Sequence, residues 1–130
     1  MLLELDVLRK QPAVETSIII YPERFLDFDL YLDFHAEANN FLELMNCEGV
    51  YQLATFHPEF RFADSYDNDP ADYTNRSPYP MLHILREDSV TKVLESYPNP
   101  DEIPARNVAL ARELGYEKVK SIRQACFDLN

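Results

Sequence analysis

The chain has little glycine, little cysteine and few basic residues, and each shortage excludes a class of protein. Only 2 of its 130 residues are glycine, so the Gly-rich loops that hold phosphates in Walker and Rossmann motifs are absent. Its 2 cysteines, Cys47 and Cys126, lie far apart and form no CxxC pair. Two isolated cysteines in a chain of this length do not make a disulfide framework.

Acidic residues clearly outnumber basic ones. The chain has 23 Asp and Glu against 12 Lys and Arg, a formal net charge of −11. This charge repels phosphate backbones, and no run of Lys or Arg offers a local basic patch, so we expect no nucleic-acid partner. No apolar run approaches the ~20 residues of a membrane helix. Glu4 and Asp6 interrupt the apolar N-terminal stretch, which argues against a secretory signal. We therefore expect a cytoplasmic protein without a membrane partner.

Hydrophobic periodicity predicts one α/β domain over residues 1–130. Strands are expected near 16–21, 50–56 and 81–86, a long helix within 23–47, and further helices after the third strand. The strand–helix–strand order predicts that the first two strands are parallel. The third is expected to run antiparallel to the second. The fold class is therefore a small mixed sheet packed with helices, a two-layer sandwich.

The connection over residues 58–80 is unusually long and rich in Asp, Asn, Tyr and Pro. A loop of more than ~15 residues in a compact domain is usually functional or disordered, and the aromatic residues of this one favour a packed loop. It leads into the stretch YTNRSPYPMLH, residues 73–83. If strands 50–56 and 81–86 are antiparallel, His57 and this stretch meet at one end of the sheet.

We predict a binding or catalytic site for a small anion at this sheet end. A guanidinium, an amide and hydroxyls can hold a carboxylate or phosphate, and a histidine can act as acid or base. His57 is the candidate catalytic residue, and alternation along the strands allows His83 to share its face. The predicted ligand-binding residues are Asn75, Arg76, Ser77, Tyr79 and His83.

Each candidate also has a structural interpretation. A histidine among apolar strand residues, such as His83, is more often a core residue with a hydrogen-bond partner. His57 precedes Pro58, which favours an extended conformation and a simple strand end. Arg76 can pair with a nearby aspartate: Asp64, Asp67, Asp69 or Asp72.

The sequence identifies no metal and no cofactor. Histidine, cysteine and aspartate occur at no recognisable ligand spacing for zinc. The run Asp67-Asn68-Asp69 lacks the glycine and the closing glutamate of a calcium loop. The alternative to an anion site is a protein-interaction module in which the aromatic 58–80 loop docks a partner through Phe60, Phe62 and Tyr66.

Two stretches resemble a known family. FHPEFRFA, residues 56–63, and YTNRSPYPMLHILRE, residues 73–87, are similar to the bacterial family called domain of unknown function 1415. The similarity extends from Thr16 to about Gly115. The family has no assigned activity, so the resemblance implies no mechanism. Members of the family tend to be longer, with an N-terminal segment holding an Asn-Leu-Cys-Pro-Phe-like stretch, so the resemblance implies either a truncated form or a short open reading frame.

A missing N-terminal segment would leave apolar surface uncovered. Leu2, Leu5 and Leu8 recur at spacings of three, which predicts a short helix over residues 2–9. The apolar residues concerned are these three leucines and Ile18 to Ile20 of the first strand. The three consecutive isoleucines also predict a strand that is buried on both faces. Self-association is the simplest way to cover such surface, so we expect a homodimer.

Overall fold

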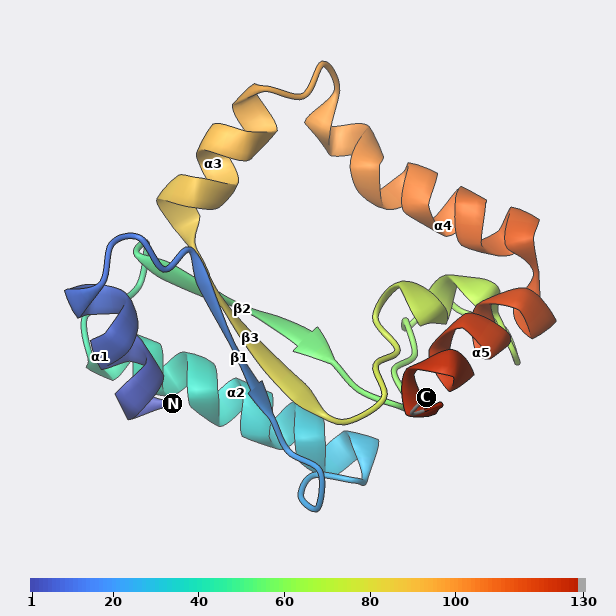
Figure 1. Cartoon of the computed structure of the whole chain (residues 1–130), viewed down its shortest axis with the longest axis horizontal. Helices are drawn as coiled ribbons and strands as arrows, with labels where there is room; N and C mark the ends of the chain where they lie inside the picture. Colours follow the sequence, from blue (N-terminus) through green and yellow to red (C-terminus); the bar gives the residue numbers. More distant parts are fainter. Residues whose placement is uncertain (129–130) are drawn as a thin grey trace.

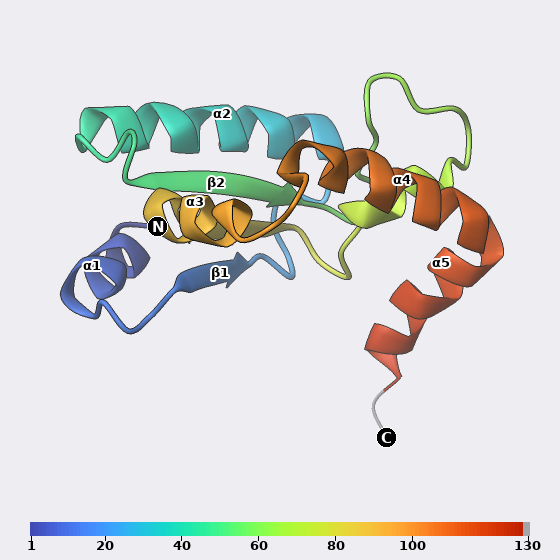
Figure 2. The same ribbon diagram turned by 90° about the horizontal axis from the view of Figure 1, so that it is seen from above.

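A three-stranded antiparallel sheet forms the centre of the computed structural model, which describes residues 1–128 (Figures 1 and 2). The strands lie in the order β1 (Thr16–Ile20), β3 (Met81–Arg86), β2 (Tyr51–Phe56). The predicted small α/β fold is confirmed, and so is the antiparallel pairing of β2 with β3. The sheet is not mixed, because β3 lies between the two strands that run in the same direction.

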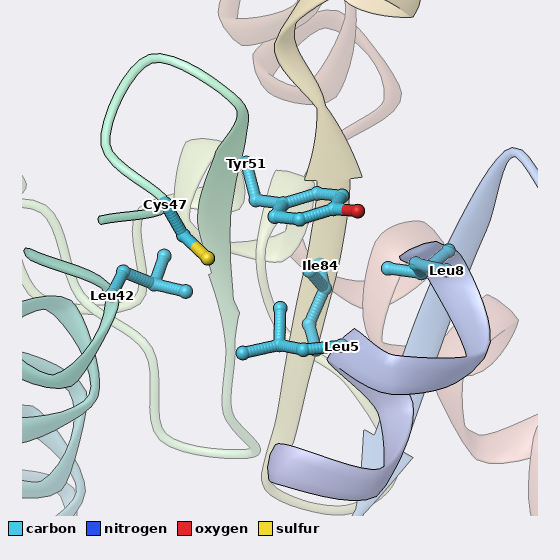
Figure 3. Close-up of a cluster of buried hydrophobic side chains, with 6 residues drawn as sticks. All are labelled: Leu5, Leu8, Leu42, Cys47, Tyr51 and Ile84. Carbon is cyan, nitrogen blue, oxygen red and sulfur yellow. The ribbon is translucent and has the colours of Figure 1, made fainter. Parts of the chain in front are cut away.

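Two helices cover one face of the sheet. α1 (Leu2–Lys10) and α2 (Phe28–Leu44) pack against it and close the main hydrophobic cluster. That cluster joins both helices to β2, to β3 and to the turn after α2, and it consists of Leu5, Leu8, Leu42, Cys47, Tyr51 and Ile84 (Figure 3). The expectation that Leu5 and Leu8 lack cover is wrong, since they are 3% and 0% exposed.

The opposite face of the sheet is open along β1. Ile18 and Ile20 are 53% and 50% exposed, whereas Ile19 lies between them and packs against the core. Side chains alternate between the two faces of a strand, so only Ile19 can face the helices. The predicted burial of this strand on both faces is therefore wrong.

The helices that follow β3 form an arch that leaves the sheet and returns to residues 57–80, the segment between β2 and β3 (Figure 1). α3 (Glu87–Glu95) continues from β3 and has no buried residue. A 3-10 turn, η2 (Pro100–Glu102), leads into α4 (Ile103–Leu114), and α4 packs against η1 (Pro70–Thr74). Gly115, at φ 81°, separates α4 from α5 (Tyr116–Gln124), and η3 (Ala125–Phe127) follows. The left-handed φ favours glycine at this junction.

The hydroxyl of Tyr31 holds the ends of two strands together. It donates a hydrogen bond to the Met81 C=O at 2.7 Å and accepts one from the Phe56 N–H at 3.1 Å. The side chain comes from α2 and is 0% exposed. Burial raises the pKa of Tyr31 to about 12, so the hydroxyl keeps its proton at neutral pH. This contact fixes where the 57–80 segment leaves β2 and where it enters β3.

We expect Tyr31→Phe to lower the free energy of unfolding by about 1–3 kcal/mol, because the part-buried Phe56 N–H and Met81 C=O lose their partner. Urea denaturation measures this change. Tyr97→Phe is the matched control, since Tyr97 is 45% exposed and its hydroxyl makes no hydrogen bond within residues 1–128. Equal stability of the two variants would contradict the bridging role.

Candidate anion-binding site

The 57–80 segment folds around two buried aspartates, Asp69 at the N-cap of η1 and Asp72 within η1. Asp69 is 0% exposed and caps η1 by accepting a hydrogen bond from the Ala71 N–H at 3.0 Å. Its two carboxylate oxygens accept hydrogen bonds from Nε and Nη2 of Arg112 on α4, at 3.1 and 2.7 Å. This bidentate pair attaches the C-terminal helices to the segment.

The hydrogen bonds from Arg112 hold the pKa of Asp69 below its usual range, against the opposing effect of burial. A carboxyl with a depressed pKa in the folded state stabilises the fold above its unfolded pKa of about 3.9. That stabilisation is lost as the pH falls through the lower, folded pKa.

Asp69→Asn should therefore lower the melting temperature at pH 7 by at least a few degrees, and its deficit against wild type should shrink below about pH 4. Thermal unfolding followed by circular dichroism between neutral and acid pH gives the measurement. Asp67→Asn is the control, because the Asp67 carboxylate is 91% exposed in a surface pair with Arg61. A deficit independent of pH, or an equal one in the control, would contradict this account.

Arg76 pairs with one of the four aspartates named as alternatives, Asp72. Its Nη2 lies 3.3 Å from Oδ2 of Asp72, and its Nε donates to the Phe60 C=O at 2.9 Å. Asp72 is 1% exposed, and its other oxygen accepts from the Phe62 N–H. Arg76 therefore has a structural role, because it ties two parts of the segment together.

His57 is fully buried, and both of its ring nitrogens are hydrogen-bonded. Nδ1 accepts from the Glu59 N–H at 3.0 Å, so Nε2 carries the proton and donates to the Phe25 C=O at 2.9 Å. The ring packs on Phe28 and Tyr31, with centroids 5.1 and 5.0 Å away. This is the arrangement of a core histidine, and the ring offers no nitrogen to a ligand in this conformation.

His83 lies on the opposite face of the sheet from His57. His83 is paired with Ala54 in the strand register, and the His83 ring lies beside the ring of Phe56. His57 is the next residue after Phe56, so its side chain lies on the other face of the sheet, against α2. The expectation of a shared face is therefore wrong. Nε2 of His83 is hydrogen-bonded to the Thr16 hydroxyl, and burial lowers the pKa of the ring.

The other predicted residues hold the segment in place. The Asn75 side-chain amide donates to the Thr55 C=O at 3.1 Å, and the Asn75 C=O accepts from the His57 N–H. The Ser77 hydroxyl donates to the Tyr79 C=O. The Tyr79 ring, 40% exposed, packs against Phe127. Of the six predicted site residues, Arg76 lines the cavity beside the C-terminal helices.

That cavity lies between η1 and the two C-terminal helices and has a volume of about 430 Å³. Its basic groups are Arg76 and, from α5, Arg123. Both guanidinium carbons lie over the Tyr73 ring, 4.9 and 5.9 Å from its centroid. The remaining wall is mostly apolar, with Pro78, Leu110, Ala111, Leu114, Val119 and Ile122 beside Thr74, Asn107 and Cys126.

Arg123 has hydrogen-bonding capacity that the described residues do not use. Its Nη1 donates to the Pro58 C=O at 2.8 Å. Its Nε is buried and has no hydrogen-bond partner within residues 1–128, and no carboxylate there forms an ion pair with it. Sequence analysis missed Arg123, because the residue lies far along the chain from the 57–80 segment. The one signal in the sequence was its place on an amphipathic helix, and only the structure shows that this helix packs against the segment.

Residues 1–128 contain neither a cluster of metal ligands nor a membrane-spanning helix. No three His, Cys, Asp or Glu side chains come together there as metal ligands. No helix in the same range combines the length and the apolar character needed to cross a membrane.

The fold and the cavity define a small α/β protein with an antiparallel sheet and a basic pocket at its C-terminal helices. The model of the family described as "Protein of unknown function (DUF1415)" matches residues 1–121, and the chain therefore belongs to this family. No curated protein and no solved structure matches the chain.

Proposed function

We propose that this protein binds a small carboxylate-bearing molecule in the cavity between η1 and the α4–α5 helices. The observation that carries the proposal is the buried Nε of Arg123, which has no partner within residues 1–128 although a buried N–H is costly to leave unpaired. A carboxylate oxygen is the acceptor that a guanidinium binds best.

Charge supports an anion at this cavity. Arg76 and Arg123 both face Tyr73, and Asp72 is the one carboxylate that pairs with either of them among the described residues. The cavity therefore keeps an excess of positive charge in a chain whose net charge is −11. A local field of that sign concentrates small anions.

The apolar wall defines the rest of the ligand. Leu110, Leu114 and Ile122 line the cavity and are 53%, 44% and 52% exposed, so a ligand would cover them. The volume lies in the range of small-molecule sites. The best candidate is an amphipathic carboxylate with a short aliphatic or aromatic body, whose head meets Arg123 and whose body packs on the helices.

The proposal is for binding rather than catalysis. A general acid or base must reach the reacting atom, and both ring nitrogens of His57 are already engaged. Arg76 contributes charge from a position that Asp72 and Phe60 already fix. Arg123 is the cleaner probe, because its substitution breaks fewer internal contacts.

Wild-type protein should be stabilised against heat by benzoate or hexanoate, and Arg123→Gln should lose at least about tenfold in affinity for them. A charge-assisted hydrogen bond contributes about 1.5–3 kcal/mol, which corresponds to such a loss. Thermal-shift titrations measure the affinities, since ligand at 100 times its Kd stabilises the fold by about 2.7 kcal/mol.

Arg106→Gln is the matched control, because Arg106 is exposed on α4 and does not line the cavity. Arg123→Lys separates charge from geometry, since lysine keeps the charge without the planar fork and should recover only part of the binding. Equal stabilisation of wild type, Arg123→Gln and Arg106→Gln, or none in wild type by carboxylates or phosphate, would refute the site.

The interaction module has weaker support. Of its three proposed anchors, Phe60 is 9% exposed and packs on Phe28 and Phe62, which leaves Tyr66 as the one strongly exposed ring. A docking surface needs a contiguous exposed patch, so the 58–80 loop is the second candidate.

A further inference from the structure

β1 has a free edge on which the backbone groups are unpaired. Within residues 1–128 it pairs only with β3 and has no strand on its outer side, and it borders the sheet on the side away from β2 (Figure 2). The Tyr21 N–H donates to the Pro80 C=O, so Tyr21 faces β3. In an antiparallel pair every second residue bonds to the neighbouring strand, and the residues between them direct their backbone groups to the other side. The N–H and C=O groups of Thr16, Ile18 and Ile20 therefore point outward.

The two edges of the sheet differ in protection. On β2 the outward C=O of Thr55 accepts a hydrogen bond from the Asn75 side chain. On β1 the outward groups have no such partner within residues 1–128. Thr16–Ile20 also contains no charged residue, proline or glycine, the devices that normally protect an exposed edge. Such an edge is a template for another strand.

We propose that β1 pairs antiparallel with β1 of a second copy of this chain, about a two-fold axis at Ile18. This register places Ile18 opposite its own counterpart and Thr16 opposite Ile20. All three outward-facing residues then form hydrogen-bonded pairs at two bonds a pair, about six in all. The result is a continuous six-stranded sheet with an isologous interface.

The distribution of charge along β1 permits a second copy in this register. Two molecules of net charge −11 repel each other, so association requires a contact without opposed like charges. With Ile18 at the centre, Glu15 lies opposite Tyr21, and Ala13 lies opposite Glu23. Among residues 13–23, which this register places opposite one another, no carboxylate faces another carboxylate. Ile18 and Ile20 of both copies also become neighbours on the open face, which reduces their exposure.

Sedimentation equilibrium of the purified chain should show a dimer, and Ile18→Glu should convert it to a monomer, because the two-fold axis places the two new carboxylates opposite each other. Leu44→Glu is the control: it introduces the same charge on a residue that is 80% exposed at the end of α2, and the dimer should persist. Circular dichroism establishes that each variant is folded. A wild-type chain that stays monomeric at all concentrations overturns the proposal, and so does a dimer that Ile18→Glu leaves intact.

Mixing two variants tests the axis itself. Ile18→Lys alone should also be monomeric, and an equal mixture with Ile18→Glu should form a heterodimer, because residue 18 faces only its counterpart. A mixture that stays monomeric would overturn this register. If either charged variant fails to fold, amide hydrogen exchange of wild type decides. The Ile18 and Ile20 amides should exchange more slowly as concentration rises, and rates independent of concentration would overturn the proposal.

Discussion

The hydroxyl of Tyr31 is the contact on which the arrangement of the molecule depends. A long segment that leaves one strand and re-enters its neighbour separates the strands at that point, and backbone groups there lose their ladder partners. Tyr31 reaches from α2 and pairs with Phe56 and Met81, one from each strand. One side chain thus joins the helical layer to the sheet and closes the sheet at the point where the segment begins and ends. His57 extends the same anchor, since its ring packs on Tyr31 and bonds to the turn before α2.

Beyond Tyr31, the contacts of the 57–80 segment are determined by its two buried carboxylates. Asp69 and Asp72 are buried, and a buried carboxylate requires compensating donors. Asp72 obtains them within the segment, from Arg76 and the Phe62 N–H. Asp69 obtains them from Arg112, which brings α4 against η1. The candidate site depends on this second pairing, because Arg112 holds α4, which forms part of the cavity wall, against η1.

Local patterns predicted most of the elements and little of the site. The strand at 81–86 and the helix ending at Gly115 follow from hydrophobic runs and from glycine at a positive φ. The facing of the two histidines could not be predicted, because a shift of one residue moves a strand side chain to the other face. The partners of Arg76 were named only as a set, since four aspartates lay within reach along the sequence. Arg123 was missed because its proximity to Tyr73 depends on how α5 packs, a long-range property that no local pattern encodes.

The exposed α3 has a consequence for the local stability of the cavity wall. The helix has no buried residue, so the C-terminal helices are held to the rest of the molecule mainly by their contacts with η1. Few buried contacts mean a low free energy for local opening. We therefore expect α4 and α5 to open more readily than the sheet and α2, which Tyr31 holds together. Because α4 and α5 form a wall of the cavity, a ligand bound there stabilises these two helices against local opening before it affects global unfolding.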